Sequence, residues 1–272
     1  MSINPRQLIL KLLQASAGQP LSAREAVTGA AVLGLRENSV RVALLRLTNA
    51  GLIQLAGRGA YRLGPKAVAL ASEVAAWRDA EQRVSSWDGG WVAVYAGALG
   101  RSDRAVLRAH ERALAVLGLR ALERDLWLRP DNLQGGVAAL RERLHGLGLS
   151  REAVVFRAHD LDREREQRAR SLWDAAALDR HYREQRTELE LWLTRADSLA
   201  LDQAARESFL LGDAAIRSLV FDPLLPAPLV DVRARRSFAA CVQRFDRAGH
   251  QIWRRLLAAA PARGTSAALV AP

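Results

Sequence analysis

The hydrophobic pattern changes its period within residues 1–66, and this change constrains the fold more than any other feature. Over 36–47 the apolar residues recur at spacings of three and four, as on one face of an α-helix. After Gly51 they alternate in two short runs, 52–55 and 60–63, as in β-strands. A helix followed at once by a hairpin predicts the last helix and the wing of a winged helix-turn-helix domain.

Two earlier segments supply the other helices of such a domain. An amphipathic helix is expected after Pro5. A second one begins at Ser22, which together with Glu25 has the S-x-x-E form of a capping box. It is expected to run to Leu33 and to stop at Gly34, a residue typical of the position after a helix end.

The third helix has one apolar stripe and a polar opposite side. The predicted core stripe is Val40, Ala43, Leu44 and Leu47. A helix in the major groove contacts bases from its N-terminal turns and phosphates from its flanks. The candidates for base contact are therefore Asn38, Ser39, Arg41 and Val42, and those for phosphate contact are Arg36 and Arg46. Arg58, between two glycines at the hairpin tip, is expected near a phosphate or the minor groove.

The charge of the chain is concentrated in this segment. The net charge is +11 over 272 residues, and residues 1–66 contain nine Lys or Arg against two Glu. A basic excess in one small domain is typical of polyanion binding. A coding preference for Arg over Lys does not explain the scarcity of acids. The alternative is a winged helix that binds another protein.

Downstream segments predict two further domains, so the chain is expected to be a multidomain α+β protein. The segment 67–90 is expected to connect the first domain to the second. A helix predicted from residue 66 to about residue 83 forms most of it, and a break follows that helix. Residues 91–160 alternate as β-α-β-β-α-β, the succession of a ferredoxin-like domain. Residues 161–260 are mostly helical and are expected to serve dimerisation and effector binding, and 261–272 form a frayed tail. Within 91–160, the predicted helix over 101–117 turns Val106, Leu107, Leu114 and Leu117 inward, and a second helix covers 132–147.

Several functional classes lack support in the sequence. The single cysteine, Cys241, permits no internal disulfide, and the histidines are too scattered for a metal site. There is no phosphate-binding glycine loop or nucleophile elbow, and no acid ends the first strand of the middle domain, where a nuclease would need one. No segment has the length of a membrane span or the form of a secretory signal. We expect a cytoplasmic protein without cofactor, metal or enzymatic activity.

Five motifs in this order resemble the phenylacetic-acid-degradation repressors, the PaaX-like transcriptional regulators. They are Asn38-Ser39-Val40-Arg41-Val42-Ala43-Leu44-Leu45-Arg46-Leu47, Trp87-Asp88-Gly89-Gly90-Trp91, Leu126-Trp127-Leu128-Arg129-Pro130, Leu172-Trp173-Asp174 and Phe221-Asp222-Pro223-Leu224-Leu225-Pro226. The resemblance implies a homodimeric repressor that binds a palindrome-like double-stranded DNA operator and is released by an aryl-CoA or other acyl-CoA thioester. It also implies DNA contacts for Arg41 and Arg46. The chain departs from its relatives at 230–233, where they commonly have an aromatic residue and a glycine.

An effector would be expected between the middle and C-terminal domains. Aromatic side chains there are suited to stack an aryl group, and arginines to contact the phosphates of CoA. The candidates are Trp127, Arg129, Trp173, Tyr182, Arg183 and Arg186, with Trp91 and Trp192 as further aromatic residues. For each tryptophan the simpler interpretation is core packing, and for Arg183 and Arg186 it is a solvated helix face. A second alternative is an RNA-binding sheet, for which Tyr95 and Trp127 are the exposed aromatic candidates.

Overall fold

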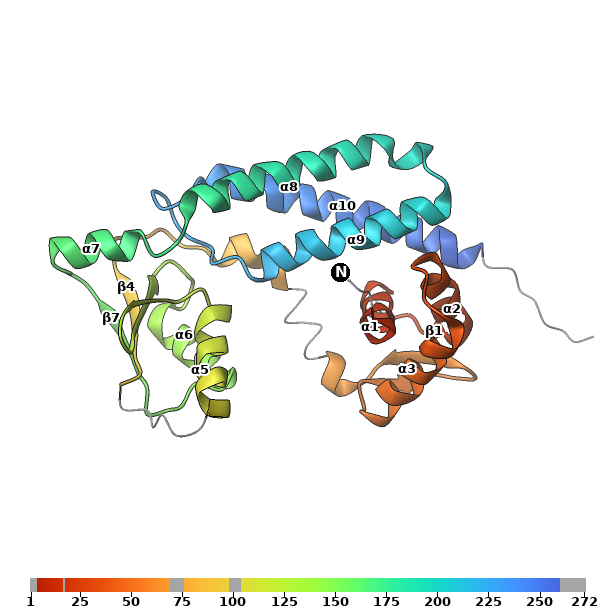
Figure 1. Ribbon diagram of the computed structural model, residues 1–272, viewed down its shortest axis with the longest axis horizontal. Helices are drawn as coiled ribbons and strands as arrows, with labels where there is room; N and C mark the ends of the chain where they lie inside the picture. The colour runs from red at the N-terminus through yellow and green to blue at the C-terminus, as the bar shows by residue number, and fades with distance from the viewer. Residues whose placement is uncertain (1–3, 17, 69–75, 98–103, 260–272) are drawn as a thin grey trace, which may run out of the picture. The chain divides into compact units, whose positions relative to one another are not determined.

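The structure is a computed structural model that describes residues 4–16, 18–68, 76–97 and 104–259 (Figure 1). The chain is α+β and mainly helical, with two small antiparallel sheets and a helical C-terminal part, as the predicted fold class requires. It divides into two compact units. The first comprises Met1–Ala75, Trp192–Gly212 and Arg244–Pro272, and the second comprises Ala76–Leu191 and Asp213–Gln243. None of the helices within the described ranges combines the length and apolar character needed to cross a membrane.

The N-terminal part of the first unit contains α1 (Pro5–Ala15), α2 (Ala23–Val32) and α3 (Glu37–Asn49). The predicted capping box is present, because the Ser22 hydroxyl accepts from the Glu25 amide and the Glu25 carboxylate accepts from the Ser22 amide. After α2, Gly34 adopts a φ of +73°, and the Leu35 amide donates to the Ala30 carbonyl. This turn ends the helix where the sequence predicts.

A three-stranded sheet completes this part, with β1 (Leu21–Ser22), β2 (Ile53–Leu55) and β3 (Ala60–Leu63) in the order β1-β3-β2. Strands β2 and β3 form the predicted hairpin, with Ile53 opposite Leu63 and Leu55 opposite Tyr61. The hairpin follows α3 directly, and Ile53 is buried while Leu55 is exposed. Ile53 therefore packs into the core, while Leu55 faces solvent.

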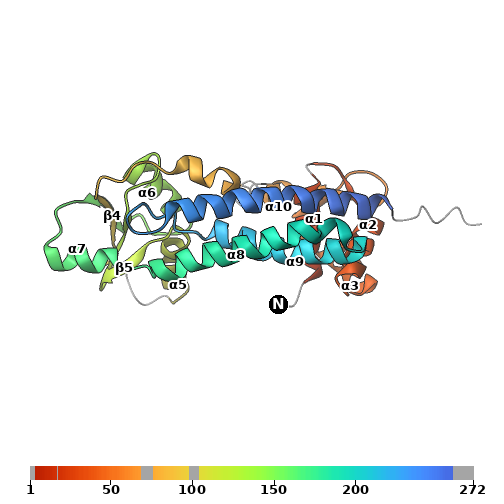
Figure 2. The ribbon, with the colours of Figure 1, turned by 90° about the horizontal axis from the view of Figure 1, so that it is seen from above.

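The first unit also contains the ends of three long C-terminal helices. They are α8 (Ala175–Arg195), α9 (Leu201–Val220), which follows the short η2 (Ala196–Ser198), and α10 (Val232–Ala258). These helices run alongside one another (Figure 2), and the Trp192 ring packs against the Phe245 ring at 4.7 Å. A Cβ atom on Gly29 would lie 3.0 Å from the Trp253 ring, so α2 approaches α10 closely only because residue 29 has no side chain.

The second unit is built on a four-stranded sheet. Its elements are β4 (Trp91–Tyr95), α5 (Arg104–Val116), β5 (Arg120–Glu123), β6 (Leu126–Pro130), α6 (Gly136–Gly146) and β7 (Val154–Ala158), in the spatial order β5-β6-β4-β7 with every neighbouring pair antiparallel. On one face Val92 and Val94 pack against α5 and α6 through residues such as Leu114 and Leu144. Alternation of side chains along a strand places Trp91 and Ala93 on the other face.

That other face is covered by C-terminal residues. Trp91, Ala93 and Leu128 share a core with Trp173 and Leu225. The helix α7 (Arg163–Arg170) and the turns after it lead the chain from β7 to this position. The 3-10 helix η1 (Ala76–Arg83) belongs to the same unit. The residues predicted as separate middle and C-terminal domains thus share one continuous core here.

Three details differ from the sequence-based expectations. The segment predicted as one connecting helix is helical at 65–68 and is a 3-10 helix at 76–83, while Ala71, Val74 and Ala75 lie outside the described residues. Helix α6 begins at Gly136 rather than at residue 132, because Gly135 and Gly136 both have positive φ, which belongs to a turn. Val106 is 42% exposed although the sequence pattern places it in the core, because the buried face of α5 is formed by His110, Ala113 and Leu114.

Candidate functional site

The exposed side of α3 contains all the predicted contact residues of that helix. Asn38, Ser39, Arg41, Val42 and Arg46 are exposed, as is Arg36 at the helix N-cap. The predicted stripe Val40, Ala43, Leu44 and Leu47 is buried beneath them. Val42 is 40% exposed and Leu45 is 62% exposed, so apolar side chains also face outward on this side. The helix therefore offers polar, basic and apolar groups together.

The arginines of α3 differ in their partners. The Arg41 guanidinium forms an ion pair with Glu37, at 2.6 Å, and the two side chains are 65% and 56% exposed. An exposed pair at i, i+4 contributes only about 0.3–0.5 kcal/mol, so a phosphate can compete with it. The side chains of Arg36 and Arg46 form no ion pair or hydrogen bond within the part of the chain that the structure describes.

The hairpin tip presents Arg58 alone. Gly57 and Gly59 have φ values of +125° and +68°, and the Ala56 amide donates to the Ala60 carbonyl across the turn. The positive φ angles explain why glycine flanks the arginine on both sides. Arg58 is exposed, and its guanidinium has no ion-pair partner among the described residues.

A hollow of about 510 Å³ lies beside α3 in the same unit. One wall is the start of α1, with Asn4, Pro5 and Arg6, and the other is α3. The residues on the α3 side are Asn38, Ser39, Val42, Ala43, Arg46 and Leu47, together with Ala50 just beyond the helix. The hollow and the exposed face of α3 thus share four of the predicted contact residues.

The predicted effector residues occupy different environments. Trp127 is half-buried on the sheet face that packs against α5 and α6. Trp173 is buried on the opposite face, where its ring is stacked with Trp91 at 6.3 Å. Trp91 and Trp192 are fully buried. The Trp173 indole nitrogen is buried without a hydrogen-bond partner.

The three predicted effector arginines already have protein partners. Arg129 is 3% exposed, and its guanidinium donates to the carbonyls of Leu117, Pro130 and Pro223 and to the side chain of Asn132. Burial lowers the pKa of Arg129 to about 10, which still leaves it charged at neutral pH. Arg183 pairs with Asp231 at 2.7 Å and Arg186 with Glu190 at 3.2 Å, and both side chains are exposed.

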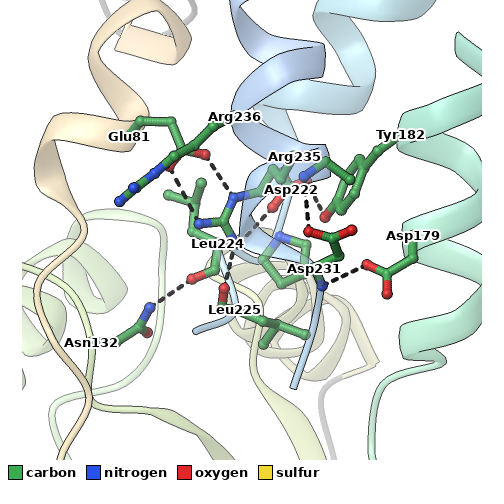
Figure 3. A network of polar contacts seen from close by, with 12 residues as sticks. Glu81, Asn132, Asp179, Tyr182, Asp222, Leu224, Leu225, Asp231, Arg235 and Arg236 are labelled. Atoms are coloured by element: carbon green, nitrogen blue, oxygen red, sulfur yellow. Dashed lines mark hydrogen bonds and ion pairs between the residues drawn. The ribbon is translucent and has the colours of Figure 1, made fainter. Parts of the chain in front are cut away.

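Tyr182 belongs to a network of polar contacts around the segment 222–235 (Figure 3). We call this network the polar hub, and its side chains are those of Glu81, Arg129, Asn132, Tyr182, Asp222, Arg235 and Arg236. Its hydroxyl donates to the Asp222 carboxylate at 2.7 Å. Arg235 is fully buried, pairs with Glu81 at 2.6 Å and donates to the Leu225 carbonyl. Three carbonyls of the segment therefore accept from buried side chains: Pro223 from Arg129, Leu224 from Asn132 and Leu225 from Arg235.

The environment of the polar hub shifts the pKa values of the Asp222 carboxyl and the Tyr182 phenol. Burial raises the pKa of Asp222, although the Tyr182 hydroxyl and the Leu224 amide, both of which donate to it, act in the opposite direction. Burial and the nearby Asp222 charge raise the pKa of Tyr182. Tyr182 therefore keeps its proton at physiological pH, and its hydroxyl can donate a hydrogen bond to Asp222.

Sequence reasoning missed the contacts of the polar hub and one residue that lines the hollow, Arg6. Arg235, Glu81 and Asp222 are separated by up to 154 positions, and only the rigidity of the proline-rich segment was apparent. Arg6 gave no signal beyond its charge, because it lies before the first apolar residue of α1. No pattern within a short window could have joined these residues to their neighbours.

Comparison with known proteins agrees with the resemblance. Residues 173–255 match the family model described as PaaX-like protein C-terminal domain. This match supports membership of the PaaX-like family, and the family points to a transcriptional regulator. No curated protein matches the chain.

One solved structure extends the likeness to nearly the whole chain. It is the Uncharacterized protein Rv0674 from Mycobacterium tuberculosis, with a TM-score of 0.68 and 21% sequence identity. The match covers 94% of this chain and 99% of that chain. At this identity the likeness shows a shared fold and nothing about activity.

Proposed function

We propose that the chain is a DNA-binding transcriptional repressor whose residues 1–66 form a winged helix-turn-helix domain. The observation that supports this most is the face of α3. Its buried stripe fixes the helix on its domain, while Asn38, Ser39 and Val42 are exposed and Arg46 has no described partner. A helix of this kind can enter a major groove and exchange hydrating water for base edges and phosphates.

The remaining elements support the finer fold assignment. The order α1, β1, α2, α3, β2, β3 is that of three helices with a wing. The succession β4-α5-β5-β6-α6-β7 and the spatial order of its strands agree with a ferredoxin-like middle domain. We take the wing tip Arg58 and the N-cap residue Arg36 as backbone contacts.

Homodimerisation and an effector complete the proposal. A homodimer suits a palindrome-like operator, because two-fold symmetry in the protein is matched by two half-sites. An acyl-CoA or aryl-CoA thioester would relieve binding. Of the predicted effector arginines, Arg183 and Arg186 remain accessible, since their surface ion pairs contribute little and can be exchanged for phosphate.

The two alternatives receive less support. An RNA-binding sheet needs aromatic side chains together on one exposed face. Tyr95 is 46% exposed, whereas Trp127 lies on the face covered by α5 and α6, so the two do not form a platform. A partner-binding winged helix does not require basic side chains that lack counter-ions on the face of α3.

The first test measures binding of a labelled random-sequence DNA duplex by fluorescence anisotropy at several salt concentrations. We expect affinity to fall steeply with salt, with a slope of about −0.9 for each neutralised phosphate in log–log form. An operator is then selected from a random duplex pool. Arg41→Ala and Arg46→Ala should each weaken operator binding by about 1–3 kcal/mol. Binding that is absent at low salt, or operator affinity unchanged in both variants, would refute the proposal.

A further inference from the structure

We infer that the hollow between α1 and α3 binds a backbone phosphate of duplex DNA, with Arg6 as a contact that positions α3. This inference rests on the proposed function and adds Arg6, on α1, to the contacts expected from the exposed face of α3. The hollow has a volume of about 510 Å³ and is formed entirely within the first unit. Its lining combines two arginines with the side chains of Asn4, Asn38 and Ser39.

The charges around the hollow favour an anion. Arg6 stands on the α1 wall and Arg46 on the α3 wall, and both are exposed. Neither guanidinium has an ion-pair partner among the residues that the structure describes. The lining residues in those ranges include no acid that would neutralise them. Two arginines that face one polar hollow without a counter-ion form an electropositive site.

Other arginines of the chain show what this site lacks. Arg41, one turn from Arg46, is paired with Glu37, and Arg183 is paired with Asp231. In those places an acid on the same helix, or just before a neighbouring one, offsets the cation. At the hollow no acid among the described residues does so, and we infer that the counter-ion is a bound anion. A DNA phosphate has the required charge and presents oxygens that guanidinium groups recognise.

The position of the hollow matches the path of a DNA strand. An α-helix with its side chains is about 10–12 Å across, and the major groove is about 12 Å wide, so the backbones run close along both flanks of an inserted helix. The hollow follows the flank of α3 that faces α1. Asn38, Ser39 and Val42 line it and also belong to the predicted base-reading face. A phosphate held there would fix how far α3 enters the groove and in which register.

This geometry gives Arg6 a role distinct from that of the base-reading residues. Phosphate contacts fix register and orientation but contain no direct sequence information. Loss of the Arg6 contact should therefore weaken binding to every duplex while leaving the preferred sequence the same. Asn38 and Ser39, by contrast, are expected to determine which sequence is preferred.

The test compares Arg6→Gln with Arg206→Gln in the full-length protein. Arg206 is a matched control because it is exposed on α9 in the same unit and has no described ion-pair partner. Binding of a random-sequence duplex is measured across a salt series. We expect the log–log slope of Arg6→Gln to be smaller by about 0.9, which corresponds to roughly eightfold weaker binding at 0.1 M salt when affinities converge at 1 M. Arg206→Gln should keep the wild-type slope.

Selection from a random duplex pool supplies the second readout. Arg6→Gln should return the same consensus as the wild type. If the wild type shows no salt-dependent binding to DNA, the proposed function itself fails. If the wild type binds but Arg6→Gln and Arg206→Gln have equal slopes, the hollow is not a phosphate site and the proposed function stands. A changed consensus for Arg6→Gln would also overturn the positioning role.

Discussion

Arginines on the exposed face of α3 and at the wing tip have environments opposite to those of the arginines in the polar hub. Arg46 and Arg58 are exposed and lack counter-ions among the described residues. Arg235 is fully buried against Glu81, and Arg129 is enclosed by carbonyl groups. The same residue type is proposed to bind a polyanion in one region and holds a segment in place in the other. The surroundings, not the residue, determine which role applies.

The difference has a thermodynamic basis. An exposed guanidinium remains hydrated and can exchange water and counter-ions for a phosphate at low cost. A buried one has lost its hydration, and it is tolerated only because carboxylate and carbonyl groups replace the water. Removing an exposed arginine should therefore change binding with little effect on stability. Removing a buried one should change stability first.

The largest expected effect is in the polar hub, where two neighbouring arginines contact one carboxylate. Arg235→Met should lower the free energy of unfolding by about 3 kcal/mol, because it leaves Glu81 and the Leu225 carbonyl without their buried donor. Arg236 also pairs with Glu81 but is 62% exposed, so Arg236→Met should cost less than about 1 kcal/mol. Urea unfolding at neutral pH measures both. Equal losses for the two variants would show that burial does not distinguish them.

A smaller effect is expected from the titration of Asp222. Burial raises its pKa in the folded protein above the ordinary value of 3.8, so the folded state retains a proton that the unfolded state has lost. Its stabilising contribution is complete below the unfolded pKa and is lost as the pH rises through the folded pKa. The wild type should therefore lose stability relative to Asp222→Asn as the pH rises from about 4, by at most about 1.4 kcal/mol per pH unit.

Urea unfolding of the wild type and Asp222→Asn at several pH values separates this titration from that of the other carboxylates. The side-chain amide introduced by Asp222→Asn keeps one oxygen, which can accept from the Leu224 amide. Its NH2 group replaces the oxygen that accepts from Tyr182 and can donate to the Tyr182 hydroxyl oxygen instead, so the comparison removes mainly the ionisation. A difference that grows in favour of the wild type with rising pH would mean that Asp222 is stabilised as an anion. The sign of the slope therefore decides the assignment.

The sequence predicted the first unit better than the second because its determinants are local. The Ser22 and Glu25 capping box, the stripe from Val40 to Leu47 and the glycines around Arg58 each act within a few residues. Their outcome depends little on distant parts of the chain. The predicted contact residues of α3 are accordingly exposed on one side of the helix.

The polar hub could not be predicted in this way. Arg235 and Glu81 are 154 positions apart, and nothing near Arg129 indicates that the carbonyls of Leu117 and Pro223 enclose it. Arginine in a short window is most often a surface residue, so the effector interpretation of Arg129 assumed accessibility. Long-range packing, which decides the burial of these residues, leaves no trace in the spacing of charges.

The smallest expected effect concerns the wing. Arg58→Ala should weaken duplex binding by about 1 kcal/mol or less and change the free energy of unfolding by no more than about 0.5 kcal/mol, because the side chain is exposed and unpaired among the described residues. Anisotropy titration and urea unfolding measure the two quantities, with Arg206→Ala as the control for a simple loss of charge. The consensus selected from a random pool should not change if the wing contacts only the backbone. A consensus that loses A·T preference at its edges would instead place Arg58 in the minor groove, where base pairs are distinguished mainly as A·T or G·C.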